Sequence, residues 1–115
     1  MKHALVSALL LALASVCSTP VIAQYPNKPI RLIVPFPPGG SNDIVGRLIA
    51  NELTAKLGQQ MVIDNRGGAG GMIGTETAAN ARPDGYTLLI ISVAYAYNPS
   101  IYKSLLRFDP EKSLT

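Results

Sequence analysis

The sequence is short of the residues that most often carry reactive chemistry. Its 115 residues include one cysteine, Cys17, one histidine, His3, and no tryptophan. Both Cys17 and His3 lie in the first 23 residues, which are interpreted below as a segment removed on export. The remainder can therefore form no disulfide, no thiolate metal site and no histidine-ligated zinc site. Without a histidine to activate a serine, and with no carboxylate pair at a suggestive spacing, we expect no catalytic residue, metal or cofactor.

A strong charge of either sign is also missing. Ten Lys and Arg residues stand against seven Asp and Glu residues, which gives a net charge of +3. These charges are scattered along the chain rather than gathered in a basic run. We therefore expect an ordinary solvated surface and no nucleic-acid partner.

The N-terminal residues have the pattern of a secretion signal. Met1–His3 is a short basic start, Ala4–Val16 is an apolar run, and the segment ends in small or modest residues at Val21–Ala23. This order predicts a signal peptide that is cleaved near Ala23. The mature chain would then run from Gln24 to Thr115, which is 92 residues with a net charge of +2, because Lys2 is lost.

Two other readings of this segment are less favoured. A transmembrane anchor needs about 20 apolar residues, and Ala4–Val16 is shorter than that. A lipid attached at Cys17 would normally follow a small residue with leucine three positions before the cysteine, whereas Ala14, Ser15 and Val16 precede it.

The rest of the chain alternates between strand and helix patterns, and its length suits one small domain. The predicted strands are Ile30–Val34, Gln60–Asp64 and Tyr86–Ile91, and the third is apolar enough to be buried on both faces. The predicted helices begin at Asn42, at Met72 and at Pro99, and they end at Gly58, at Ala81 and at Lys103 or Ser104. This order predicts an α/β fold in three layers, with a parallel sheet and right-handed crossovers in a βαβαβ start.

The first predicted helix has an apolar face and recognisable ends. Ser41 is a plausible N-cap and Gly58 a plausible C-terminal stop. The apolar positions recur at intervals of three and four: Ile44, Val45, Leu48, Ile49, Leu53 and Leu57.

Two loops are the best candidates for a binding crevice. In an open parallel sheet, ligands bind beyond the carboxyl ends of the strands, where successive connections leave in opposite directions. Three strands in the order 2-1-3 would place the loop Phe36–Ser41 next to the loop Ser92–Asn98, with Tyr95 central in the second.

The first of these loops suits an anion. Gly39 and Gly40 allow the backbone to approach a ligand, the following helix directs its free N–H groups at the same point, and Ser41 could add a hydroxyl. An equally good reading is that the prolines and glycines only turn the chain and that Ser41 only caps the helix. Asp43, in the first helical turn, is expected to favour the helix dipole rather than to act catalytically.

A second glycine cluster, Gly68–Gly74, follows a strand and opens a helix, as a dinucleotide fingerprint does. However, Ile73 stands where that fingerprint needs glycine, and Ser92 stands where an acidic residue is expected. No phosphate-binding P-loop motif is present either. Dinucleotide binding is therefore disfavoured.

Six ordered motifs together resemble one family, the periplasmic solute receptors of tripartite tricarboxylate transporters, or Bug family. They are Tyr25-Pro26-x-Lys28-Pro29-Ile30-Arg31, Val34-Pro35-Phe36-x-Pro38-Gly39-Gly40-x-x-Asp43, Asn65-Arg66-x-Gly68-Ala69-Gly70-Gly71-x-Ile73-Gly74, Pro83-Asp84-Gly85-Tyr86-Thr87-Leu88-Leu89, Asn98-Pro99-Ser100-Ile101-Tyr102 and Phe108-Asp109-Pro110. The resemblance covers essentially the whole predicted mature chain.

The resemblance implies a type II periplasmic binding-protein fold that closes two lobes over a carboxylated solute and passes it to a membrane permease. It implies that the solute is a dicarboxylate, a tricarboxylate or an amino acid, and that no enzyme activity or metal is involved. Ligand contacts would come from Phe36–Ser41 and Ser92–Tyr97, with Asn65–Gly71 as a neighbour. The candidate ligand-binding residues are Phe36, Pro38, Gly39, Gly40, Ser41, Asn65, Gly70, Gly71, Ser92 and Tyr95.

Members of that family are much longer than this chain. Residues 24–115 are accordingly expected to form part of a first lobe, without the second. Two alternatives to a receptor fragment remain open at this point: an exported Rossmann-like enzyme domain, and a truncated remnant without function.

Overall fold

The computed structural model describes residues 24–104, 106–110 and 112–114. The predicted signal peptide, residues 1–23, lies outside the described residues. The elements in chain order are strand β1 (Ile30–Val34), helix α2 (Ser41–Leu57), strand β2 (Met61–Asn65), a 3-10 turn (Ala69–Gly71), helix α3 (Met72–Ala79), strand β3 (Thr87–Leu89) and helix α4 (Ala94–Ile101).

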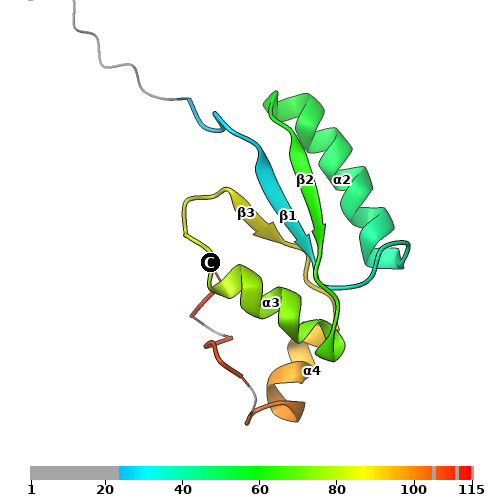
Figure 1. Ribbon diagram of the computed structural model, residues 1–115, viewed down its shortest axis with the longest axis vertical. Helices are drawn as coiled ribbons and strands as arrows, with labels where there is room; N and C mark the ends of the chain where they lie inside the picture. Colours follow the sequence, from blue (N-terminus) through cyan, green and yellow to red (C-terminus); the bar gives the residue numbers. More distant parts are fainter. Residues whose placement is uncertain (1–23, 105, 111, 115) are drawn as a thin grey trace, which may run out of the picture.

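The three strands form one parallel sheet in the order β2-β1-β3, as Figure 1 shows. In β1, Ile30 pairs with Met61 of β2, and Leu32 pairs with Leu88 of β3. The predicted α/β class, parallel pairing and strand order are therefore confirmed. All three strands end at the same edge of the sheet, so the loops that follow them lie together.

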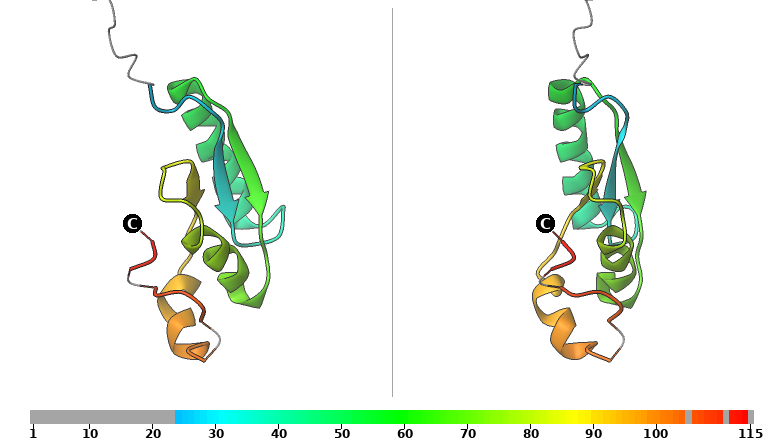
Figure 2. Two further views of the ribbon diagram at one scale, coloured as in Figure 1. Left: turned by 60° about the vertical axis from the view of Figure 1, so that its left-hand side comes forward. Right: turned by 90° about the vertical axis from the view of Figure 1, so that its left-hand side faces the viewer.

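Helices cover both faces of this sheet. α2 packs on β1 and β2, and α3 packs on β1 and β3. The right-hand view of Figure 2 shows α2 on one side of the strands and α3 on the other, close to the strand ends. No helix in the described residues is long and apolar enough to cross a membrane.

The core lies between β1 and α2. Ile30, Leu32, Ala50 and Met61 are all buried and form one cluster. α2 approaches the sheet through small residues: a Cβ on Gly46 would lie 3.0 Å from Ile90 Cδ1 and 3.2 Å from Val34 Cγ2. A helix that packs through glycine and alanine can lie close to the sheet, but it leaves its larger side chains at the flanks.

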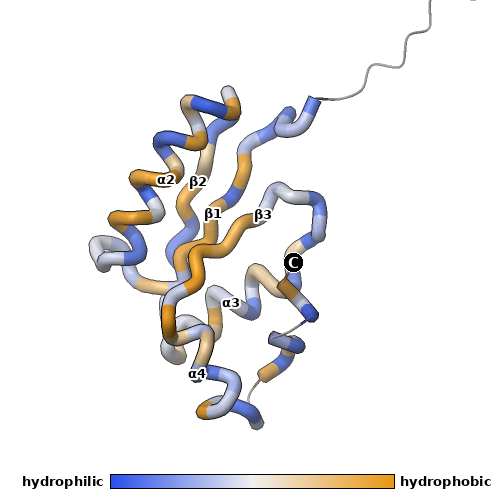
Figure 3. The backbone as a smooth tube through the Cα atoms, turned by 180° about the vertical axis from the view of Figure 1, so that it is seen from behind, coloured by the Kyte–Doolittle hydropathy of each residue, from blue (hydrophilic) through white to orange (hydrophobic). Residues whose placement is uncertain are grey.

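The apolar face predicted for α2 is largely exposed. The buried residues of this helix are Asp43, Gly46 and Ala50. Ile44, Val45, Leu48 and Ile49 are 55%, 48%, 62% and 43% exposed. Figure 3 shows several hydrophobic stretches along α2.

The predicted capping of α2 is half right. Gly58 ends the helix in the left-handed conformation, with φ 66°, and its N–H donates to Thr54 O. The prediction of Ser41 as N-cap is wrong: Gly40 occupies that position, Ser41 is the first helical residue, and no side-chain cap is present. The physical reason is that Asp43 binds back to the preceding loop, as described below, which starts the helix one residue earlier.

Strand β3 is shorter and less buried than predicted. It spans three residues, and Leu88 is 37% exposed. Its ladder with β1 ends with the hydrogen bond from Ile90 N to Ile33 O, at 3.0 Å. The prediction of a strand buried on both faces is therefore wrong, because α3 packs on β3 whereas α2, on the other face of the sheet, packs on β1 and β2.

The predicted loop Ser92–Asn98 is mostly helix. α4 begins at Ala94, and Pro99, the predicted helix start, lies inside it. The Ser92 hydroxyl accepts the Ala94 N–H at 3.2 Å, and Tyr95 N donates to Ser92 O at 3.0 Å. These bonds turn the chain into a helix well before Pro99, which has no N–H to donate within that helix.

The remaining boundaries move by a few residues. β2 includes Asn65, which the sequence analysis placed in the following loop, and α3 ends at Ala79 rather than Ala81.

Candidate functional site

The loop between β1 and α2 leaves open space beside its glycines. Gly39 has φ 85°, and a Cβ built there would meet no atom within 4 Å. A Cβ on Gly40 would have only Pro37 O near it, at 3.5 Å. The positive φ favours glycine at position 39, and the open space allows another molecule to reach the backbone.

The first turn of α2 supplies hydrogen-bond donors at this point. The first bond of the helix runs from Ile44 N to Gly40 O, at 3.0 Å. The N–H groups of Ser41, Asn42 and Asp43 therefore have no acceptor within the helix. Together with the positive end of the helix dipole, these groups can bind a carboxylate or a phosphate.

Asp43 fixes this loop from within. Its side chain is buried, and its Oδ2 accepts the Gly39 N–H at 2.9 Å and Arg47 Nε at 2.9 Å. Its Oδ1 accepts the Asn65 side-chain amide at 2.9 Å. Hydrogen bonds from Arg47, Gly39 and Asn65 lower the pKa of Asp43 from 3.8 to about 2, so this carboxylate is ionised at neutral pH.

Asn65 ties the same loop to the neighbouring strand. Its amide nitrogen donates to Phe36 O at 3.2 Å as well as to Asp43 Oδ1. An asparagine amide has two N–H donors, so both are committed within the protein. The oxygen that remains is an acceptor, and an acceptor does not bind a carboxylate.

The second glycine-rich segment packs directly on the first loop. A Cβ on Gly67 would lie 3.2 Å from Pro37 Cδ, and one on Gly71 would lie 3.4 Å from Phe36 Cζ. Gly70 and Gly71 both have positive φ, 64° and 94°. These glycines are accounted for by close packing and turn geometry.

Asn98 of α4 joins the third segment to the second. This residue is only 6% exposed, and its side-chain amide nitrogen donates to Gly70 O at 2.8 Å. The segments after β1, β2 and β3 therefore lie together at the carboxyl ends of the strands, as Figure 1 shows. The structure thus brings Phe36, Asn65, Gly70 and Gly71 together.

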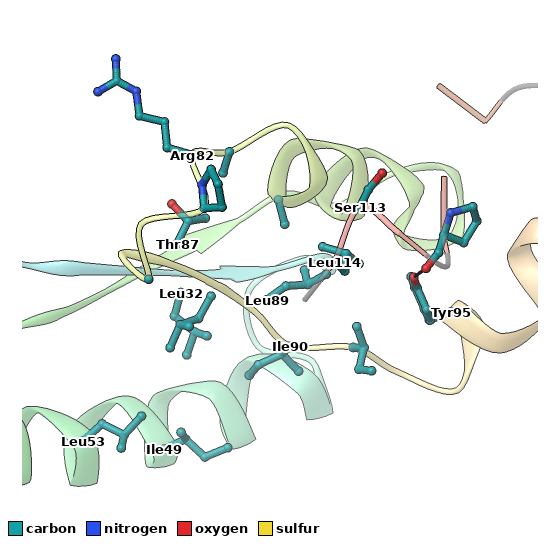
Figure 4. Close-up of a pocket in the computed structure, with 17 residues that line it drawn as sticks. Leu32, Ile49, Leu53, Arg82, Thr87, Leu89, Ile90, Tyr95, Ser113 and Leu114 are labelled. Atoms are coloured by element: carbon teal, nitrogen blue, oxygen red, sulfur yellow. Dashed lines mark hydrogen bonds between the residues drawn. The ribbon is translucent and has the colours of Figure 1, made fainter. Parts of the chain in front are cut away.

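The side chains of Ser92 and Tyr95 make hydrogen bonds within the protein, away from the glycine-rich loops. The Ser92 hydroxyl caps the turn before α4, and the Tyr95 hydroxyl donates to Pro110 O. Tyr95 lines a cavity of about 750 Å³ together with Leu89 and Ile90 of the β3 edge, as Figure 4 shows. Burial, and then the charge of Asp109, raise the pKa of the Tyr95 hydroxyl.

This cavity does not coincide with the glycine loops. Its lining includes the flank of α2 at Ile49 and Leu53, the β3 edge and residues 110, 113 and 114 near the C-terminus. It is therefore an apolar space beside the open edge of the sheet. The described residues contain no group of three or more His, Cys, Asp or Glu side chains that could hold a metal ion.

The sequence analysis missed two residues of this site, Asp43 and Asn98. Its place in the first helical turn predicts only that Asp43 favours the helix dipole, yet its spacing from Gly46 and Ala50 places it on the buried side of α2. The small residues, rather than the large apolar ones, mark that side. Asn98 was assigned to the end of a loop, and no pattern in the sequence indicates its contact with Gly70.

Comparison with known proteins identifies the family. Residues 45–115 match the sequence model of the family described as the tripartite tricarboxylate transporter family receptor. BugT of Bordetella pertussis is 49% identical over an alignment of 96 positions, and the match covers 76% of this chain and 29% of BugT.

Solved structures agree with this match. The periplasmic binding protein BugD superposes with a TM-score of 0.73 at 42% identity, over 77% of this chain and 29% of BugD. MatC from Rhodopseudomonas palustris, solved with bound malate, superposes with a TM-score of 0.64 at 36% identity, over 77% of this chain and 30% of MatC. The chain thus spans less than a third of the length of these relatives. It belongs to the tripartite tricarboxylate transporter receptor family.

Proposed function

We propose that this chain takes part in the capture of a small carboxylate in the periplasm. The observation that carries the proposal is the glycine-rich loop Phe36–Gly40, which lies at the start of α2 with open space beside Gly39. MatC holds malate, a dicarboxylate, in its solved structure. A carboxylate bound at the N–H groups of Ser41 and Asn42 would use the same kind of donors that a helix start offers to any anion.

The charge of the loop supports this assignment. The buried carboxylate of Asp43 is paired with Arg47 at 2.9 Å, so the ion pair adds no net charge near the loop. The donors that face the ligand are then neutral N–H groups. Such a site can bind a carboxylate without the strong hold of a buried cation, which suits a receptor that must release its solute.

The wider role rests on the family. In this proposal, residues 1–23 are a signal peptide, residues 24–115 form part of a first lobe, and the partner is the membrane permease of a tripartite transporter. The solute is a dicarboxylate, a tricarboxylate or an amino acid. Ser92 and Tyr95 would contribute through the start of α4, and Gly70 and Gly71 through the loop that packs on Phe36.

Export can be tested directly. The chain is expressed with residues 1–23 in a Gram-negative host, and the periplasmic product is analysed by intact mass. We expect a chain that begins at Gln24. Material that keeps Met1–Ala23 and stays in the cytoplasm would contradict the localisation.

Ligand capture is tested by amide NMR on the purified processed chain. Malate, citrate, aspartate and NAD are added in turn, and the neutral diamide of malate serves as the matched control. We expect malate to move the amide signals of residues 39–43, and the diamide to leave them in place. Shifts with NAD alone would favour a Rossmann-like enzyme domain, and no shift with any compound would favour a remnant without function.

A further inference from the structure

We infer that Asp43 and Asn65 are positioning residues, which hold the loop Phe36–Gly40 in its binding conformation before any ligand arrives. These two side chains, called here the Asp43–Asn65 clamp, bind the loop at both ends. The ligand-binding part of this inference rests on the function proposed above, and the conformational part does not.

The clamp contacts the loop backbone on two sides. Asn65 donates to Phe36 O at 3.2 Å, at the start of the loop. Asp43 accepts the Gly39 N–H at 2.9 Å, near its end. The two side chains are joined to each other at 2.9 Å, so one continuous hydrogen-bonded path spans the loop.

The sheet gives this path a rigid base. Asn65 is the last residue of β2 and pairs with Val34 of β1. The next residue, Arg66, donates its N–H to Val34 O at 2.8 Å. Asn65 therefore anchors the loop to the sheet, and Asp43 anchors it to the first turn of α2.

The clamp also decides which donors are left for a ligand. The Gly39 N–H is turned toward Asp43 and is already bonded. The donors that remain at this point are those of the first turn of α2, where no acceptor exists within the helix. Because Gly39 has φ 85°, the chain can make this inward turn without strain.

Charge alone would predict the opposite effect of Asp43. A carboxylate beside an anion site repels the anion, so removing its charge should strengthen binding if charge were its only contribution. If Asp43 acts by holding the loop, removing the charge-assisted bond to Gly39 should weaken binding instead. The sign of the change therefore separates the two explanations.

The decisive variant is Asp43→Asn, with Glu52→Gln as the matched control. Glu52 lies on the same helix, is exposed, and loses the same charge on substitution. The first measurement is the amide spectrum of the unliganded chain. We expect the Gly39 signal to move strongly in Asp43→Asn and to stay in place in Glu52→Gln, while the Gly58 signal at the far end of α2 stays in place in both.

The second measurement is malate titration of the same proteins. We expect Asp43→Asn to bind about tenfold more weakly than the unsubstituted chain, since a charge-assisted hydrogen bond is lost, and Glu52→Gln to bind as the unsubstituted chain does. Equal or tighter binding by Asp43→Asn would overturn the inference. So would an unchanged Gly39 signal in that variant.

A third variant guards against misfolding. Asn65→Ala removes the bond to Phe36 O but keeps the bond between Asp43 and Gly39. If Asp43→Asn does not give a dispersed spectrum, Asn65→Ala decides: altered signals at residues 36–40 with the Gly58 signal unchanged support the clamp, and unchanged loop signals refute it. If the unsubstituted chain binds no malate, the proposed function fails, while the Gly39 measurement still tests the clamp.

Discussion

Asp43 shows how a single buried carboxylate can organise a loop. Its three hydrogen-bond partners come from the loop, from its own helix and from the neighbouring strand. The pair with Arg47 has the i,i+4 spacing of a helix and can be read from the sequence, but the contact with Asn65, 22 residues away, cannot. What the sequence did provide was the loop itself, because prolines and glycines between a strand and a helix predict a turn.

Protonation of Asp43 should contribute to the loss of stability of this chain in acid. Its pKa is lowered to about 2 in the folded chain, so its ionised form stabilises the fold above about pH 4, and this contribution is lost as the pH falls toward 2. In urea unfolding, Asp43→Asn should therefore be less stable than the unsubstituted chain at pH 6, and the gap should narrow as the pH is lowered toward 2.

The pKa values of two other aspartates are also lowered in the folded chain. The acid dependence of stability can therefore be assigned to Asp43 only by comparing variants with each other. Burial opposes ionisation of Asp64, but hydrogen bonds from Arg31 and Arg66 outweigh it and lower its pKa. The Tyr86 N–H lowers the pKa of Asp84. Both residues are intact in Asp43→Asn and in the Glu52→Gln control, so a gap that stays constant with pH would count against the assignment to Asp43.

Gly74 is a second residue whose identity is tightly constrained. A Cβ at this position would lie 2.7 Å from Pro35 Cα and 2.8 Å from Arg66 O, and backbone atoms cannot move aside easily. We expect Gly74→Ala to lower the free energy of unfolding by about 1–3 kcal/mol, despite the better helix propensity of alanine.

Gly40→Ala is the matched control for that measurement. Gly40 has φ −76°, and a Cβ there would be 3.5 Å from its nearest neighbour, Pro37 O. Because Gly40 is the N-cap of α2, where alanine is less favourable than glycine, its effect in the same denaturant titration should be a loss of no more than about 1 kcal/mol. If Gly74→Ala lowered the free energy of unfolding no more than Gly40→Ala does, the result would contradict the close packing of α3 on Pro35.

The helices and strands that are bounded by proline or glycine were predicted best. β1 has the predicted bounds, Ile30–Val34, because prolines flank an apolar run that is rich in isoleucine and valine. α2 ends at the predicted glycine. The errors fall on β3 and α4, where an apolar run continues into residues that could serve either as strand or as loop, and local hydrogen bonds at Ser92 decide the outcome.

The segment before β1 is held by an aromatic contact that links distant parts of the chain. The Tyr86 hydroxyl donates to Asn27 Oδ1 at 2.8 Å and accepts the Asn27 N–H at 3.0 Å. The ring of Tyr25 packs edge-on against the ring of Tyr86, with 5.0 Å between the ring centroids, and the Tyr25 hydroxyl donates to Gly85 O. These contacts fix the lead-in to β1 on the turn before β3.

Tyr86→Phe should loosen this lead-in without unfolding the sheet. The variant loses both bonds to Asn27 but keeps the ring contact, so we expect a loss of stability of about 1 kcal/mol. Hydrogen exchange of the Asn27 amide should become clearly faster, while that of Leu32 should hardly change. Tyr97→Phe, at a half-exposed tyrosine of α4, is the control, and equal exchange rates for Asn27 in the two variants would contradict the contact.

For the molecule as a whole, the open edge of β3 is the main liability. In the described residues β3 pairs only with β1, and the cavity beside it is lined by apolar side chains. Exposed Leu48 and Ile49 on α2 add to the uncovered apolar surface. Unpaired strand edges promote association between chains.

We therefore expect the purified chain to self-associate and to bind a solute weakly on its own. Sedimentation velocity at increasing concentration should show species larger than a monomer. Thr87→Lys, which places a charge on the edge strand, should reduce them, and Glu52→Lys, which reverses a charge at an exposed position of α2, should not. A monomeric chain that melts cooperatively would contradict this expectation.

The backbone donors at the start of α2 have a genetic consequence. An N–H group is present whatever side chain a codon specifies, proline excepted, so substitutions at Ser41 or Asn42 can accumulate without deleting a donor. Asp43 and Asn65 are different, because their contribution is made by the side chain. In the arrangement proposed here, mutations that weaken binding should concentrate at positions whose side chains never touch the solute, and a random mutagenesis screen would locate the scaffold more readily than the contact surface.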